Sequence, residues 1–467
     1  MKLTVQVVLH ADDDTETVLG EAVTLIRQEL APETLGLQLQ EAKDLLAAVQ
    51  ITVVEHQVAA ALACQVTCPD CGVPRRHKDS RPIVMRTLFG TLRLDSPRWW
   101  ACRCSCPSGT ARTLSPLAAM LPERTTPELS YLQARFAGLV SYGLSADLLS
   151  EILPLGRVLH ATTVRRQVQA TAQRLEDELG EEQAVFITGC PAQWAELPRP
   201  DLPLVVGLDG GYVHCSAQQS RRDGWFEVIA GKAMPAVGRS SCFGYVQTFD
   251  TKPKRRVFEV LASQGMQANQ QVTFLTDGGE DIRDVPRYLN PQAEHLLDWF
   301  HITMRITVLT QLAKGLRCAS EMPVDVVEEL QRVKWFLWHG NVVRALHTVD
   351  DLTTDLADID AGRVELDKLA KAMREFGGYL SANACCIPNY AERRLAGEAI
   401  STAFVESTVN QVISKRMVKK QQMRWSPRGA HLLLQIRTRV LNDTLTDDYR
   451  RWYPAFTHTP DPLNQAA

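Results

Sequence analysis

Three acidic residues have neighbours that would suit them to bind metal ions. Asp209 ends the apolar run LPLVVGLD and Asp277 ends the run VTFLTD, and a Gly-rich turn follows each. Glu406 lies far downstream in STAFVESTVNQVISKR, whose spacing predicts a helix. Carboxylates that hold two divalent cations can stabilise the attacking and leaving oxygens of a phosphoryl transfer. The three residues are therefore candidate ligands of Mg²⁺ or Mn²⁺.

The stretch 202–301 would supply the scaffold for the first two acids. Its strand-like runs are LPLVVGLD, GWFEVIAGK, SCFGYVQTFD, QVTFLTD and EHLLDWFH. The first and fourth carry Asp209 and Asp277, and the 68 residues between the two acids (277 − 209) leave room for two strands, their turns and a helix. This order resembles an α/β RNase H-like core, in which the first and fourth strands each carry one metal ligand. We therefore expect 202–301 to be the first part of an RNase H-like catalytic core.

Asp277 and Glu406 are further apart than that core requires. The gap is 129 residues (406 − 277), and most of it has an acidic, helical pattern. We predict a helical insertion over 302–400, then a catalytic helix and a basic C-terminal part over 401–445. In that helix Glu406 and Asn410 are four residues apart and share a face. Its cationic end could hold DNA phosphates beside the metal ions, through Lys415, Arg416, Lys419 and Lys420.

Each acid alone is a weak signal, because an Asp at a strand end is more often a turn cap than a ligand. The joint pattern of the three acids reverses that preference. Two alternatives stay open, namely Asp281 or Asp284 for the second ligand and Glu398 for the third.

Composition and charge limit the class of protein. The chain has 467 residues, of which 45% are hydrophobic, so it can build a large core and is not generally disordered. The net charge is only −3, but 72–103 and 407–442 each contain eight Lys or Arg residues. Two basic segments in a nearly neutral chain indicate a polyanion bound at chosen places, although solvated faces give the same pattern.

The segment 66–108 predicts a zinc-ribbon-like module. Cys68-Pro-Asp-Cys71-Gly lets two thiolates face one ion, and Cys102 is a natural third ligand. Either Cys104 or Cys106 would be the fourth. The residues Ile83 to Leu94 between the two halves alternate like a hairpin. A redox-active or merely buried thiol cluster is the alternative to Zn²⁺.

A helical region over 109–185 contains a candidate helix-turn-helix. Its second helix would start near Thr162, with Arg165, Arg166 and Gln167 in the part that enters the major groove. An ordinary helical hairpin is the alternative.

The remaining segments complete the domain predictions. Residues 1–65 start with one strand-like stretch and then show helical spacing, as between Val18 and Ile26, so we expect an N-terminal helical segment; 446–467 is a polar tail. Trp425 could stack on a DNA base or fill a core. No run reaches the ~18 apolar residues of a membrane span, and no secretory signal is evident. We expect a cytoplasmic protein without a membrane partner.

In order along the chain, several motifs resemble those of DDE transposases of bacterial insertion sequences, in the ISKra-type group related to Mutator-like transposases. The motifs are CPDCG (68–72), RTLFGTLRLDSPRWWACRC (86–104), LDGGYVH (208–214), FLTDGGEDIR (274–283), DWFH (298–301), FVESTVNQVISKRM (404–417) and MRWSPRGA (423–430). The resemblance implies that Asp209, Asp277 and Glu406 are the metal ligands. It also implies that Asp298 and His301 support the site or the DNA strand beside it.

The leading hypothesis is therefore a DNA transposase that uses Mg²⁺ or Mn²⁺ to cut and join strands. Its partners would be double-stranded DNA of the element ends and of the target, in a nucleoid-associated complex. Because two ends must be paired, a homo-oligomer of at least two copies is expected. The alternatives are a non-catalytic DNA-binding protein derived from a transposase and a stand-alone RNase H-like nuclease.

Overall fold

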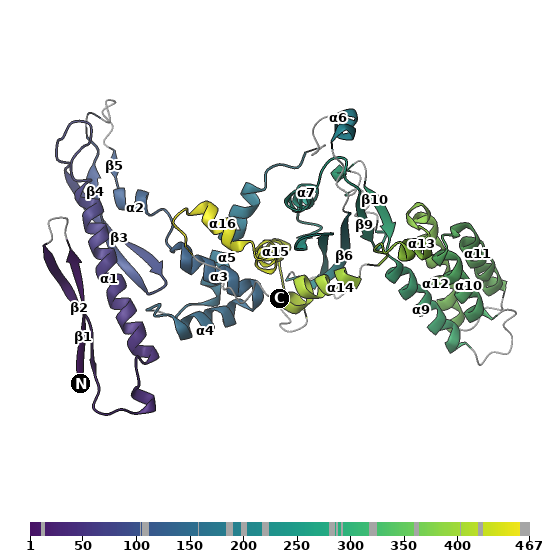
Figure 1. The fold of residues 1–467 in the computed structure, drawn as a ribbon, viewed down its shortest axis with the longest axis horizontal. Helices are drawn as coiled ribbons and strands as arrows, with labels where there is room; N and C mark the ends of the chain where they lie inside the picture. The colour runs from purple at the N-terminus through teal and green to yellow at the C-terminus, as the bar shows by residue number, and fades with distance from the viewer. Residues whose placement is uncertain are drawn as a thin grey trace. The chain divides into compact units, whose positions relative to one another are not determined.

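A computed structural model describes most of the chain, and Figure 1 shows its fold. The described residues are 1–10, 15–102, 104, 112–156, 158–183, 190–197, 203–216, 224–279, 285, 288–290, 293–316, 325–358, 364–401, 403–418 and 424–457. Two compact units are present: the first unit is Met1–Thr171 with Asp443–Ala467, and the second unit is Ala172–Asn442.

The first unit starts with strands and one long helix and continues with shorter helices. Its elements are β1 (Lys2–His10), β2 (Glu16–Ile26), a 3₁₀ turn (Pro32–Thr34), α1 (Leu39–Ala63), β3 (His77–Thr87), β4 (Gly90–Trp100), β5 (Thr113–Leu114), α2 (Pro116–Met120), α3 (Pro127–Leu139), α4 (Tyr142–Ile152), the first part of α5 (Ala161–Glu178) and α16 (Leu445–Trp452). All of α16 except its first residue lies in the segment 446–467, so this part of the chain is not the polar tail that we predicted.

The N-terminal segment 1–65 is helical only in its second half, contrary to the prediction. β1 and β2 form an antiparallel hairpin, so Val18 and Ile26 lie in a strand. The pairing register shifts twice along this hairpin. A bulge interrupts the alternation of side chains that identifies a strand, which explains why the sequence pattern looks helical.

The helix α1 is apolar as well as long. The stretch Pro32–Ala63, which contains α1, is long and apolar enough to cross a membrane by length and composition alone. Within the first unit, α1 packs on the neighbouring strands through Val54, Val58 and Leu62. The absence of a membrane partner therefore stays a prediction.

The hairpin predicted inside the cysteine module is confirmed. β3 and β4 pair antiparallel with Ile83 opposite Leu94. One face of the hairpin is buried in a small core with α1 and α2, in which Leu117 is 2% exposed. The hairpin thus has a rigid base, while Arg93 on the opposite face is exposed.

The two helices of the candidate helix-turn-helix are α4 and α5. α5 begins at Ala161, so Thr162 lies within its first turn. Val164 and Val168 are fully buried, whereas Arg165 and Arg166 are exposed. Gln167 points inward and donates to the Ser130 hydroxyl at 2.9 Å, so it does not belong to an exposed recognition surface.

The second unit combines a mixed sheet with many helices. Its elements after α5 are α6 (Pro191–Glu196), β6 (Leu204–His214), β7 (Trp225–Pro235), β8 (Ser241–Val246), α7 (Pro253–Ser263), β9 (Val272–Thr276), β10 (Glu294–Leu297), α9 (Trp299–Gly315), α10 (Val326–Trp338), α11 (Val342–Asp358), α12 (Val364–Ala382), a 3₁₀ turn (Ala384–Cys386), α13 (Tyr390–Leu395), α14 (Ala403–Val409), a π-helical segment (Asn410–Val418) and α15 (Pro427–Leu441).

The five strands of this sheet are ordered β10-β9-β6-β7-β8. β7 is antiparallel to β6 and β8, and β9 is parallel to β6 and β10. α7 covers one face through Val257 and Leu261. The opposite face is covered by α14, the π-helical segment and α15, since Val412 and Leu434 lie against Gly244. In chain order, the first and fourth strands, β6 and β9, are neighbours.

Helices occupy the interval that we predicted to be an insertion. α9 to α13 share one apolar core, which includes Leu309, Leu330, Val349 and Leu369. Figure 1 shows these helices gathered in a bundle beside β9 and β10. Along the sequence, the helices of this bundle lie between β10 and α14, and α14 carries Glu406.

A buried ion-pair cluster cross-links the second unit. Arg256 of α7 is 7% exposed and donates through Nε to Asp250 (2.8 Å) and through both terminal nitrogens to Glu176 (2.9 Å each). Its Nη2 lies 3.3 Å from Nε2 of His431 on α15. The ligand atoms of Glu176, Asp250 and His431 lie within 4.8 Å of one another, so by composition this group could hold a divalent metal. The Arg256 guanidinium already supplies positive charge there, so the cluster acts as a structural cross-link.

Acidification should weaken the second unit through Glu176. Burial opposes its ionisation, but hydrogen bonds with His431 and Arg256 prevail and lower its pKa from 4.5 to about 2. The stability from this group is therefore present above pH ~4.5 and lost as the pH falls towards ~2, a change of about 3 kcal/mol. We expect the urea midpoint of the full chain to fall more steeply over this range in wild type than in Glu176→Gln.

Glu259→Gln is the matched control for that measurement. Glu259 lies on the same helix as Arg256, but its ion pair with Arg255 is 44% exposed on the carboxylate side. Its loss should leave the pH dependence unchanged. If the urea midpoint fell equally steeply with decreasing pH in wild type and in Glu176→Gln, Glu176 would not be the source of the acid sensitivity.

Candidate functional site

Three neighbouring parallel strands bring acidic residues to one edge of the sheet. Gly207 of β6 is opposite Leu275 of β9, so continuing the register by two residues sets Asp209 opposite Asp277. Leu297 of β10 is opposite Thr276, so the next residue, Asp298, is opposite Asp277. Adjacent strands lie about 4.8 Å apart. The three acids therefore lie side by side, with Asp277 and Asp298 directly after β9 and β10. Asp209 lies within β6, which continues through Gly210 and Gly211 to His214, so the turn expected after Asp209 is not present.

His301 completes this group from the first turn of α9. Its Nε2 lies 3.6 Å from Oδ2 of Asp298 and 3.9 Å from Oδ1 of Asp209. Asp298 is fully buried and caps α9 by accepting the Phe300 amide at 2.9 Å. This cap fixes the start of the helix, and thereby the side of the helix on which His301 faces the acids.

The electrostatics of this edge favour an added cation. Burial raises the pKa of Asp209, the charges of Asp277 and Asp298 raise it further, and His301 opposes them. His301 Nε2 is buried and has no hydrogen-bond partner among the residues that the structure describes. Clustered carboxylates are the ligand type that fits Mg²⁺ or Mn²⁺, and the imidazole nitrogen could hydrogen-bond a water bound to such an ion.

Glu406 does not join this group directly. Its side chain is exposed, and it makes no hydrogen bond or ion pair with any described residue. Its helix nevertheless covers the Asp209 face of the sheet, because Val409 and Ile413 lie against Gly211, two residues beyond Asp209. Glu406 is one turn before Val409. Its assignment as the third ligand stays a prediction.

Of the three alternative metal ligands, Glu398 alone belongs to the described residues. Asp281 and Asp284 lie outside the described residues. Glu398 is exposed and forms an ion pair with Nη1 of Arg393 at 2.7 Å, so a cation already neutralises it.

The helical insertion contributes residues that the sequence pattern does not indicate. The Tyr379 hydroxyl on α12 donates to the Asp277 carbonyl at 3.0 Å, although the two residues are 102 positions apart. The Arg305 guanidinium lies 4.0 Å from the centre of the Tyr379 ring. Asn383, which directly follows the end of α12, is 1% exposed. These contacts tie the insertion to the turn that carries Asp277.

Four of the predicted zinc ligands are gathered in the first unit. The Sγ–Sγ separations are 3.5 Å for Cys68–Cys104, 3.4 Å for Cys71–Cys102 and 3.5 Å for Cys71–Cys104. All four sulfurs lie within 4.8 Å of one another. Tetrahedral Zn²⁺ with Zn–S bonds of about 2.3 Å requires separations near ~3.8 Å, so this group could hold zinc. Cys106, the alternative fourth ligand, lies outside the described residues.

The local backbone explains how the first two sulfurs converge. Gly72 has φ +72°, a conformation that L side chains rarely adopt, and its amide donates to the Cys68 carbonyl at 2.8 Å. At the other end, the Trp100 amide donates to the Arg76 carbonyl at 2.9 Å. The hairpin thus returns the chain to the first cysteine pair.

Only part of the predicted DNA-contacting set is accessible. Arg165, Arg166 and Lys415 are exposed. Arg416 is fully buried with its guanidinium 5.4 Å from the Trp425 ring, and Trp425 is 5% exposed. Neither can reach DNA in this structure, so for Trp425 the structure favours the core alternative. Lys419 and Lys420 lie outside the described residues.

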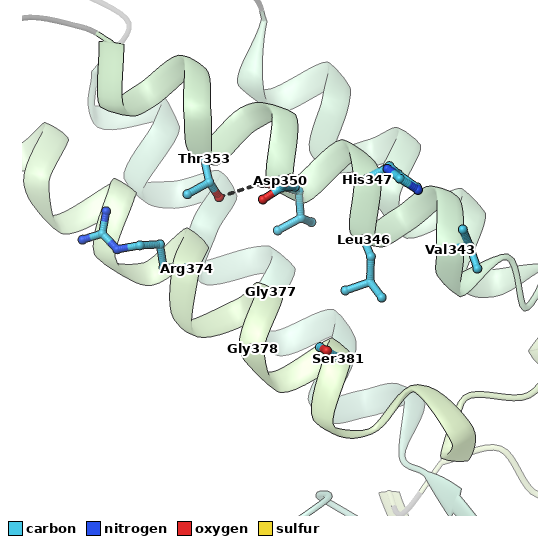
Figure 2. A pocket seen from close by; sticks show the side chains of 10 residues that line it. Val343, Leu346, His347, Asp350, Thr353, Arg374, Gly377, Gly378 and Ser381 are labelled. Atoms are coloured by element: carbon cyan, nitrogen blue, oxygen red, sulfur yellow. Dashed lines mark hydrogen bonds between the residues drawn. The ribbon is translucent and has the colours of Figure 1, made fainter.

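A groove of about 500 Å³ lies apart from the acids, between α11 and α12 of the insertion (Figure 2). Gly377 and Gly378 contribute no side chain to it, while His347, Asp350 and Arg374 line it. It marks the side of α12 that faces away from the Asp277 turn.

Comparisons with known proteins add little. No protein-family model and no curated protein match the chain. Among solved structures it is similar to the Drosophila P element transposase strand transfer complex, with 9% identity and a TM-score of 0.23 over 71% of this chain and 82% of that chain. It is also similar to the crystal structure of NurA with manganese, with 11% identity and a TM-score of 0.10 over 52% of this chain and 73% of that chain. At these values neither match carries an argument about function, which has to come from the site itself.

Proposed function

We propose that the chain is a DDE transposase with an RNase H-like core, which cuts and joins DNA strands with Mg²⁺ or Mn²⁺. The observation that supports this best is the alignment of Asp209, Asp277 and Asp298 on three neighbouring parallel strands, with His301 beside them. The RNase H-like hypothesis requires one acid on the first strand and one on the fourth, counted in chain order. Asp209 lies in β6, the first strand, and Asp277 directly follows β9, the fourth. A zinc module and a helix-turn-helix would recognise the element ends.

Each residue has a distinct task in this proposal. Asp209 and Asp277 would hold the metal ions, with Glu406 as third ligand. When bound, the two cations would activate the attacking oxygen and stabilise the leaving oxygen of a phosphodiester. Asp298 holds His301 in place, and His301 contacts the DNA strand or a water at the site. No covalent protein nucleophile is needed.

The cationic surfaces hold the substrate. Arg165 and Arg166 would lie in the major groove of an element end, and Lys415 would contact phosphates beside the acids. The protein would act in the cytoplasm on the nucleoid, as at least a dimer, because two ends must be joined.

The test is cleavage and strand transfer on DNA that carries both ends of the element. Wild type with Mg²⁺ should give joined products, and Asp277→Asn should give none while binding the DNA equally well. Cleavage without joining would favour a stand-alone nuclease. Binding by both proteins without cleavage in Mg²⁺ or Mn²⁺ would favour a non-catalytic DNA-binding protein.

A further inference from the structure

One hydrogen bond links the helical insertion to the backbone of a candidate metal ligand. Tyr379 is on α12, and its hydroxyl donates to the Asp277 carbonyl at 3.0 Å. On the other side of the same residue, the Gly279 amide donates to Oδ1 of Asp277 at 3.0 Å. Both the carbonyl and the carboxylate of Asp277 are thus restrained.

The tyrosine is itself held in place from α9. The Arg305 guanidinium lies 4.0 Å from the centre of its ring, a cation–π geometry. Arg305 is four residues after His301, so both lie on one face of α9. The ring therefore bridges the helix that carries His301 and the turn that carries Asp277.

Asn383, which directly follows the end of α12, also packs closely on the residue after Asp277. Gly278 has φ +85°, and a Cβ there would lie 2.6 Å from Oδ1 of Asn383 and 2.7 Å from Cδ1 of Leu297. Asn383 is oriented by its own bond, since its Nδ2 donates to the Tyr379 carbonyl at 2.9 Å. The turn and the helix fit together without space for a side chain at position 278.

We propose that the helical insertion positions the second metal ligand, with Tyr379 as the positioning residue and Asn383 as its support. This inference rests on the proposed function, because it concerns the same carboxylate site. An Asp that must be ordered when the metal binds loses conformational freedom at that moment, whereas an Asp already fixed does not. The insertion thereby sets the affinity of the site for divalent metal.

The discriminating variant is Tyr379→Phe, which keeps the ring over Arg305 and removes only the hydroxyl. Removing a group that orients a metal ligand typically weakens metal affinity by about 10- to 100-fold. We expect the Kd for Mn²⁺, measured by electron paramagnetic resonance on the full zinc-loaded chain, to rise about tenfold. Excess Mn²⁺ should restore most of the cleavage rate, since the ligand itself is still present.

Ser381→Ala is the matched control. Ser381 lies on the same part of α12 but lines the groove between α11 and α12 (Figure 2). Its loss should change neither Mn²⁺ affinity nor the melting temperature. The melting temperature of Tyr379→Phe should stay close to that of wild type, which separates a positioning role from loss of fold.

Two results would overturn the inference, and only the second would overturn the proposed function as well. If Tyr379→Phe binds Mn²⁺ as tightly as wild type does, the insertion does not position Asp277, and the proposed function stands. If wild type and Asp209→Asn bind Mn²⁺ equally, the carboxylates form no metal site, and the proposed function fails together with the inference.

Discussion

Asp209→Asn should lower the rate of DNA strand cleavage in Mg²⁺ by about a thousandfold or more while leaving DNA binding intact. Loss of one metal-holding carboxylate removes roughly 4 kcal/mol of transition-state stabilisation, and each ~1.4 kcal/mol corresponds to a factor of ten. Asp209 interacts electrostatically with Asp277, and its Oδ1 lies 3.9 Å from Nε2 of His301, so it belongs to the acidic group. The measurement is single-turnover cleavage of an end-bearing duplex, with binding followed separately by fluorescence anisotropy.

A control acid in the same unit makes the result specific. Asp350 lines the groove of the insertion, so Asp350→Asn changes the net charge equally without touching the carboxylate site. It should cleave at the wild-type rate. If Asp209→Asn kept more than a tenth of the activity, Asp209 would not be a metal ligand.

The same assay decides the third ligand. Glu406 is exposed and without a described ion pair, whereas Glu398 is paired with Arg393. Glu406→Gln should therefore lower the cleavage rate as Asp209→Asn does, whereas Glu398→Gln should cleave at the wild-type rate. If Glu398→Gln lost cleavage and Glu406→Gln cleaved at the wild-type rate, Glu398 would be the third ligand.

The adjacency of Asp209 and Asp277 could be predicted because it depends on local features. The β-branched run before Asp277 stops at a glycine turn and so identifies the end of β9. The glycines after Asp209 do not end β6, which continues to His214, but the parallel register of β6 and β9 still sets the two acids side by side. Asp298 and His301 entered only through the family resemblance, since a buried helix cap has no distinctive spacing. The sequence pattern could not identify Tyr379 as part of the site. Its hydrogen-bond partner is 102 residues away, and the spacing of apolar residues in a helix shows only which face of the helix is buried.

The basic helix shows a second limit of sequence patterns. Lysines and arginines after Glu406 predict one exposed cationic face, but the α-helix changes to a π-helix at Asn410. Arg416 lies on the buried face with Val412, Ile413 and Met417, whereas Lys415 is exposed. Arg437 accompanies this distortion, since its Nε donates to the Val412 carbonyl at 2.8 Å. A count of basic residues predicts charge along a segment but does not tell which of them lie on the face that packs on the sheet.

Cys71→Ser should remove zinc from the purified chain and greatly weaken binding to the element ends. Four cysteine sulfurs within 4.8 Å of one another would hold one Zn²⁺, and such sites contribute on the order of 10 kcal/mol to the folding of a small module. Without the ion, the ends of the β3–β4 hairpin would lose their main cross-link. We expect about one zinc per wild-type chain by elemental analysis, none in the variant, and a large loss of DNA affinity.

Cys64→Ser is the control, because Cys64 is an exposed free thiol just before the module and outside the four-sulfur group. It should keep both the zinc and the DNA affinity. A strong chelator should reproduce the effect of Cys71→Ser in wild type, whereas a reductant should have no effect, which separates a zinc site from a redox pair. A wild-type chain that contains no zinc and is insensitive to Cys71→Ser would contradict the zinc assignment, and the exposed residues of α5 would then have to provide recognition alone.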